Sequence, residues 1–187
     1  MKRGPAAARY LLFALYPLLI FVGLHFFEAR TVGLCVLIAL AIRYRRTALH
    51  MVSGFSLAQW LAVALPALLG AAVVATNSEA LLLLYPASIS ASMLIIFGST
   101  LLKPPTMIER LARLREPDLP EQSVRYTRRV TEAWCVFFVC NGAIAVYTAL
   151  FASREAWALY NGLIAYLLMG ALFAGERLVR RRVLSAA

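Results

Sequence analysis

Polar side chains inside long apolar runs are the residues whose types and spacing could do chemistry in this sequence. Ser88 and Ser92 lie four residues apart, just after Pro86, so they share one face of a helix. Asn141 lies at a similar depth in a later apolar run. Polar groups are costly in hydrocarbon. We therefore expect them either to hydrogen-bond between helices or to form a polar pocket for a lipid-like substrate.

Two further polar residues flank a tight hairpin centred on Arg154. Tyr147 and Asn161 are equally distant from Arg154, so the hairpin would bring them within hydrogen-bonding reach of each other. The predicted intramembrane polar cluster consists of Ser88, Ser92, Asn141, Tyr147 and Asn161.

An ionisable pair precedes the second apolar run. His25 and Glu28 have the i, i+3 spacing that places two side chains on one helix face. Such a pair could bind a proton or a substrate head group. The alternative is an ion pair at the membrane interface that also involves Arg30. The only other histidine, His50, has no neighbouring ligand residue in the sequence.

The usual signatures of enzymes and metal sites are missing from the sequence. Cys35, Cys135 and Cys140 all lie in apolar runs and lack metal-ligand spacing, so we expect them to be small apolar residues. There is no HExxH, GxSxG, P-loop or GxGxxG motif. No Asp, Glu, Lys or Arg lies deep in an apolar run, which argues against a voltage sensor or a carboxylate-driven pump. We predict no enzymatic activity, metal or cofactor.

The longest polar interval is LLKPPTMIERLARLREPDLPEQSVRYTRR, residues 101–129. Lys-Pro-Pro ends the preceding helix, and Thr106 with Glu109 has the spacing of a capping box. The next residues place Met107, Ile108, Leu111 and Leu114 on one face of a helix. The pattern predicts a short amphipathic helix, residues 106–116, lying in the headgroup region or docked on a partner protein.

Basic side chains surround this predicted helix. Seven positive charges are offset by four acids, so the interval carries a net charge of +3. We expect the basic side chains to contact anionic lipid or a protein partner, and Trp134 to anchor the following span at the interface. The candidate residues are Lys103, Arg110, Arg113, Arg115, Arg125, Arg128 and Arg129.

The composition places the chain in a membrane. Of 187 residues, 62% are hydrophobic and 15% are charged, and the mean hydropathy is +0.76. A soluble domain is about 45–50% apolar and about 25% charged. The net charge of +10 would indicate nucleic-acid binding in a soluble protein. In a membrane protein it is expected at cytoplasmic helix ends, so we expect no nucleic-acid partner.

Six apolar runs predict an all-α, polytopic integral membrane protein with six transmembrane helices and one cytoplasmic amphipathic helix. If both termini are cytoplasmic, every Lys and Arg except Arg30 and Arg154 lies inside, in keeping with the positive-inside rule. The alternative has five spans, because the apolar part of the second run, residues 31–42, is short. The predicted spans are residues 10–27, 29–45, 55–75, 80–102, 133–152 and 156–175, with a cytoplasmic loop at 103–131.

Several of these segments also resemble a known family. LYPLLIFVG near the start, LLKPP with IERL, RRVTEAWCVFF with NG and AVY, and finally W with LYNGL resemble the bacterial septation protein A family. The chain looks closer still to an uncharacterised sister group found beside genes for aryl-polyene and fatty-acyl biosynthesis. The resemblance implies an inner-membrane location, an envelope role and no established catalysis. It points to Lys103, Pro104, Trp134, Asn141, Tyr147 and Trp157.

Two functions are compatible with these patterns. The first is a non-enzymatic scaffold or accessory protein in cell-envelope, septation or acyl-lipid and polyene assembly. It would engage the anionic inner leaflet and other envelope or biosynthetic proteins. The second is a small transporter or flippase for a lipid-like molecule, built on the polar cluster.

Overall fold

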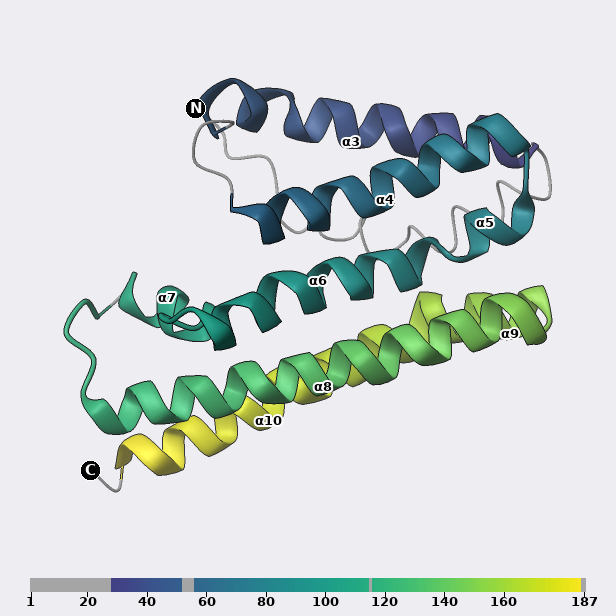
Figure 1. Ribbon diagram of the computed structural model, residues 1–187. Coiled ribbons are helices and arrows are strands. Elements are labelled where there is room, and N and C mark those ends of the chain that lie inside the picture. Colours follow the sequence, from purple (N-terminus) through teal and green to yellow (C-terminus); the bar gives the residue numbers. More distant parts are fainter. Residues whose placement is uncertain (1–27, 52–55, 115, 186–187) are drawn as a thin grey trace, which may run out of the picture.

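The computed structural model describes residues 28–51, 56–114 and 116–185, which form helices and no strand (Figure 1). The predicted first span, His25 and Arg115 lie outside the described residues. The elements are α3 (Ala29–Met51), α4 (Leu57–Thr76), α5 (Glu79–Leu83), α6 (Tyr85–Leu102), α7 (Met107–Arg113), α8 (Glu121–Phe151), α9 (Arg154–Leu159), the π-helical segment η1 (Tyr160–Ile164) and α10 (Ala165–Ser185).

The long helices form an antiparallel bundle in which neighbours in sequence are neighbours in space. α3 packs on α4, α4 on α6, and α6 on α8 (Figure 1). α10 contacts α8 where Phe173 packs on Trp134 and where the carbonyl of Glu176 accepts from the hydroxyl of Tyr126 at 3.0 Å. α7, the start of α8 and the end of α10 gather at one end, which we call the basic end. α5 and α9 lie at the opposite end. Every loop of the described chain therefore lies at one of these two ends.

Four helices are long and apolar enough to cross a membrane: Leu57–Thr76, Tyr85–Leu102, Glu121–Phe151 and Arg154–Arg180. The last comprises α9, η1 and most of α10. Large apolar side chains along them face outward, including Leu68 with 69% of its surface exposed. An apolar surface of this extent is compatible with a membrane-embedded protein. The prediction of an all-helical chain is confirmed for the described residues. Among the described residues of α3, Ala29–Ala39 forms a shorter apolar stretch.

A break divides the predicted span 80–102 into α5 and α6. Leu84 separates the two helices, and Pro86 is the second residue of α6. Proline has no amide hydrogen, so it is tolerated in a first turn but interrupts a continuous helix. At this break the carbonyl of Leu83 accepts a hydrogen bond from the indole nitrogen of Trp157 at 2.9 Å. The freed backbone group is thus satisfied by a neighbouring helix.

Glycine allows α3 and α4 to approach closely. A Cβ atom built on Gly33 would lie 2.8 Å from Cγ1 of Val73, which is fully buried. A Cβ atom on Gly70 would lie 2.7 Å from Leu37. Small residues at such crossings let backbones pack at short range, the usual source of helix association in membranes.

We expect Gly33→Val to destabilise the protein by about 1–3 kcal/mol, because the added atoms enter a packed contact. Gly170→Val is the matched control, since a Cβ there meets no atom within 4 Å. Thermal unfolding of both variants in detergent measures the difference. Equal unfolding temperatures for the two variants would contradict the close α3–α4 crossing.

An aromatic cluster joins three helices in the half of the bundle nearer the basic end. Trp134 on α8 packs against Phe97 of α6, Phe138 of α8 and Phe173 of α10, with ring centroids 4.6–6.3 Å apart. Only 4% of the surface of Trp134 is exposed. The prediction that Trp134 is an interfacial anchor is therefore wrong, because the surrounding phenylalanines bury the ring in the core.

Candidate functional site

The polar cluster inside the bundle is centred on Asn141 of α8. Its amide nitrogen donates to the hydroxyl of Ser90 on α6 at 3.0 Å. Its amide oxygen accepts from the hydroxyl of Tyr160, in η1, at 3.1 Å. Both polar ends of one side chain are thus satisfied by different helices, so Asn141 connects α6, α8 and η1.

The other members of the predicted cluster make different contacts. Ser88 and Ser92 are buried, but their hydroxyls donate to carbonyls of their own helix, those of Tyr85 and Ser88. Tyr147 is 62% exposed and stacks against Phe151. The structure does not bring Tyr147 and Asn161 together, because Asn161 bonds Thr148, the next residue along α8 and buried on a different face of the helix.

Asn141→Leu should destabilise the protein by about 1–2 kcal/mol, because two interhelical hydrogen bonds are lost and each is worth about 0.6 kcal/mol on average in membranes. Ser92→Ala is the control, since its hydroxyl bonds only within α6. Chemical unfolding in mild detergent compares the two. A larger loss from Ser92→Ala would contradict the role given to Asn141.

At the basic end, α7 docks on the bundle through polar contacts. The main-chain amide of Met107 donates to the hydroxyl of Thr100 on α6 at 2.9 Å. The amide of Ile108 donates to the hydroxyl of Thr131 on α8 at 3.4 Å. The first amides of a helix lack partners within it. Here threonine hydroxyls of two neighbouring helices accept hydrogen bonds from these amides and fix the position of α7.

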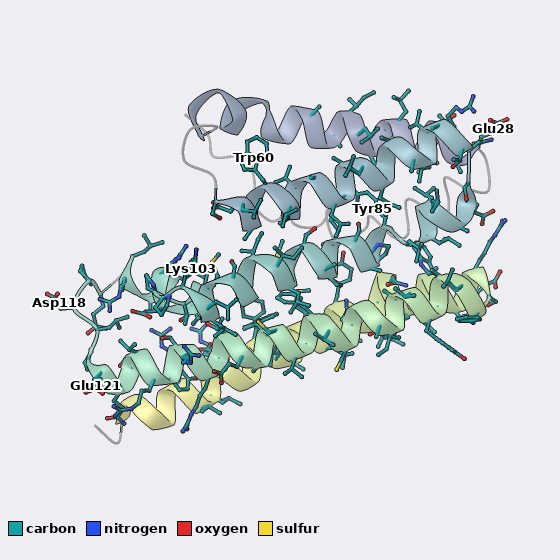
Figure 2. All side chains as sticks on the ribbon, in the orientation of Figure 1. Glu28, Trp60, Tyr85, Lys103, Asp118 and Glu121 are labelled. Atoms are coloured by element: carbon teal, nitrogen blue, oxygen red, sulfur yellow. The ribbon has the colours of Figure 1, made fainter. Side chains whose placement is uncertain are left out.

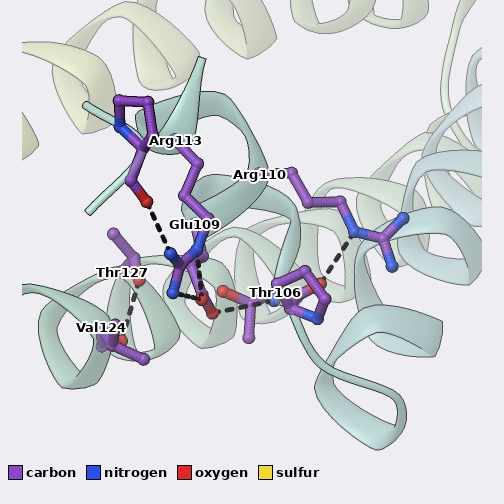
Figure 3. Close-up of polar contacts among 8 residues, drawn as sticks. Thr106, Glu109, Arg110, Arg113, Val124 and Thr127 are labelled. Atoms are coloured by element: carbon purple, nitrogen blue, oxygen red, sulfur yellow. Dashed lines mark hydrogen bonds and ion pairs between the residues drawn. The ribbon is translucent and has the colours of Figure 1, made fainter. Parts of the chain in front are cut away.

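Glu109 is the buried acid of this junction (Figure 3). One carboxylate oxygen accepts from the amide of Thr106 at 3.3 Å, as in a capping box. The other accepts from the guanidinium of Arg113 at 2.8 Å, and Arg113 also donates to the carbonyl of Pro117 at 2.8 Å. Arg113 therefore holds α7 and the following loop together, a structural task that its exposed charge alone does not indicate.

The other basic side chains of the predicted surface differ in whether an acidic side chain forms an ion pair with them. Arg125 pairs with Glu121 at 2.6 Å, and Arg128 with Glu132 at 3.2 Å. Among the described residues, no acid forms an ion pair with three exposed members of the set. These three residues, which we call the unneutralised cations, are Lys103, Arg110 and Arg129. Figure 2 shows Lys103 at the basic end and Glu28 at the opposite end.

Only part of the apolar face predicted for α7 is buried against the bundle. Met107 and Ile108 are half-buried against the bundle, whereas Leu111 is 49% and Leu114 82% exposed. The exposed leucines lie next to Arg110 and Arg113 in sequence. An apolar edge bordered by cations is the arrangement that enters the headgroup layer of a membrane or a protein interface.

Polar contacts close the opposite end of the bundle. Asn77, in the left-handed conformation with φ of 51°, donates to the carboxylate of Glu28 at 3.2 Å and accepts from the amide of Arg30 at 2.8 Å. Arg154 forms an ion pair with Glu79. Glu28 thus binds another loop of this chain. Across the described ranges, no group of three or more His, Cys, Asp or Glu residues could hold a metal ion.

Ser90, Tyr160, Thr148 and Thr131 are polar contact residues that sequence reasoning left out of the candidate set. A signal existed for Ser90, which lies between the two chosen serines. Comparison with known proteins adds no further residue: a scan of protein-family models, a search of curated proteins and a search of solved structures each found no match.

Proposed function

We propose that this chain is a multi-pass protein of the bacterial inner membrane, with six spans and both termini in the cytoplasm. The predicted span 10–27 precedes α3, and α3 runs alongside α4 (Figure 1). Arg30 and Arg43 flank the apolar residues 31–42, and basic side chains at such positions can lengthen a short span by reaching the interface. With the four long apolar helices, these two segments make six crossings.

The distribution of Lys and Arg between the two ends of the bundle supports the placement of both termini in the cytoplasm. Among the described residues, the Lys and Arg positions lie toward the basic end except Arg30 and Arg154. Both exceptions are engaged in contacts that close the opposite end of the bundle. Because cytoplasmic loops carry an excess of Lys and Arg, the basic end is the cytoplasmic face.

The function we propose is that of a non-enzymatic scaffold or accessory protein in cell-envelope, septation or acyl-lipid and polyene assembly. The observation that carries it is the exposed basic surface around α7, where Arg110, which forms no ion pair with a described acid, adjoins exposed Leu111, and Leu114 is also exposed. This surface fits anionic lipid headgroups and acidic partner proteins. The resemblance to bacterial septation protein A supports an envelope role.

A photo-crosslinking residue at Leu114 tests the proposal in native membranes. We expect Leu114 to give adducts with one or a few specific envelope proteins, and the triple variant Lys103→Gln, Arg110→Gln, Arg129→Gln to lose those adducts and cellular function. Leu68, which is 69% exposed on α4, is the matched control position and should crosslink to lipid alone. Identical adducts at Leu68 and Leu114 would refute a scaffold role for this surface.

A small transporter or flippase for a lipid-like molecule is the second candidate. The break at Leu84 favours it, because discontinuous helices often line transport sites. Under this candidate, replacing Ser88, Ser92 and Asn141 with Ala abolishes function and the triple Gln variant does not. Under the scaffold proposal the outcomes are reversed, provided that both proteins insert at equal levels.

A further inference from the structure

A π-helical turn lies in the hairpin between α8 and α10, remote from the basic end on which the proposed function rests. The amide of Ala165 donates to the carbonyl of Tyr160, five residues earlier. Turns of this kind are rare and occur frequently at functional sites. The turn contains Asn161, of which only 3% of the surface is exposed. A buried amide at such a turn needs partners for both of its polar ends.

The contacts of Asn161 determine which way its amide faces. Its nitrogen donates to the carbonyl of Trp157 at 2.9 Å and to the hydroxyl oxygen of Thr148 at 3.2 Å. Thr148 uses its own hydrogen to donate to the carbonyl of Ala145 at 3.1 Å. Both neighbours of the nitrogen are therefore acceptors, and a flipped amide would place oxygen against oxygen. The amide oxygen must face the other way.

That oxygen, Oδ1 of Asn161, is buried and accepts no hydrogen bond from any described residue. The hydroxyl of Tyr160, the preceding residue, donates to Asn141. We propose that Oδ1 of Asn161 is a binding site for a hydroxyl group, supplied by a buried water or by a membrane-soluble molecule. A neutral hydroxyl fits better than an ammonium group, because a buried cation without a counter-charge is far more costly.

Infrared spectroscopy of the full chain labelled with asparagine that carries carbon-13 only in its side-chain carbonyl group tests this site. The sequence has asparagine at 77, 141 and 161 only. Subtracting the spectra of Asn161→Leu and of Asn141→Leu from the wild type isolates two side-chain carbonyl bands. Asn141 is the matched reference, since its carbonyl already accepts a hydrogen bond. If Asn161→Leu does not fold, the double variant Asn77→Ser, Asn141→Ser leaves Asn161 as the only labelled side chain.

We expect the Asn161 band to lie at a wavenumber as low as that of Asn141, as for a hydrogen-bonded carbonyl. A band clearly above that of Asn141 would show an unpaired oxygen and overturn the proposal. Transfer from native lipid to lipid-free detergent distinguishes the sources. A low band that persists assigns the site to water, and a low band that rises and returns on adding back lipid extract assigns it to a membrane-soluble molecule.

Discussion

Trp157→Ala is expected to destabilise the protein by about 3–5 kcal/mol, the largest loss of any single substitution considered. Trp157 is 1% exposed and packs in a core with Ala29, Val73, Leu82 and Leu83, which come from α3, α4 and α5. Truncation removes a large side chain from a contact between several helices. It also leaves the carbonyl of Leu83 without its indole donor at the helix break.

Reversible unfolding in mild detergent measures this loss, with Trp60→Ala as the matched control. Trp60 is 45% exposed near the start of α4, so its truncation should cost much less. Trp157→Phe keeps an aromatic ring at this position but removes the indole donor and the rest of the bicyclic ring. We expect it to cost about 1–3 kcal/mol, because the buried carbonyl of Leu83 loses its donor. A loss of stability from Trp157→Ala no larger than that from Trp60→Ala would contradict the packing of Trp157 in the core beside the Leu84 break.

The triple variant Lys103→Gln, Arg110→Gln, Arg129→Gln is expected to weaken binding of anionic phospholipid about a hundredfold. Each basic side chain near an anionic surface contributes about 1 kcal/mol, and about 1.4 kcal/mol corresponds to a factor of ten. These three side chains have no acid paired with them among the described residues. The measurement is native mass spectrometry of the purified protein titrated with phosphatidylglycerol.

The matched control removes charges without changing the net charge. The double variant Glu121→Gln, Arg125→Gln eliminates an exposed ion pair, so its affinity should stay within about twofold of the wild type. Raising the salt concentration should weaken wild-type binding and leave the triple variant nearly unaffected. If the wild type and the triple variant bound phosphatidylglycerol with equal affinity, the basic surface would not be a lipid-binding site.

Local sequence signals predicted much of the fold. Hydrophobic runs separated by charged loops predicted the four long apolar helices. Pro86 lies at the break between α5 and α6, where proline disfavours a continuous helix, and the spacing of Thr106 and Glu109 predicted the start of α7. Each of these features depends on residues within a few positions of one another, because capping and proline effects act within a single turn.

The contacts of the candidate site depend on the rotation of each helix about its axis. A residue's position along its apolar run does not determine this rotation. Ser92 and Asn141 lie at similar depth in their apolar runs, yet Asn141 bonds Ser90. Tyr147 and Asn161 are equally distant from the turn, yet Thr148 is the residue that bonds Asn161. Burial of Trp134 depends on phenylalanines from α6 and α10 that are distant in sequence.

The orientation of the basic end tests the central claim most directly. In a variant lacking Cys35, Cys135 and Cys140, a single cysteine replaces exposed Asp118, which lies at the basic end (Figure 2). A membrane-impermeant maleimide should label Asp118→Cys in inverted vesicles and not in intact spheroplasts. Ser153→Cys, at the opposite end, should show the reverse. Labelling of Asp118→Cys from outside intact spheroplasts would contradict a cytoplasmic basic surface and the scaffold function proposed for it.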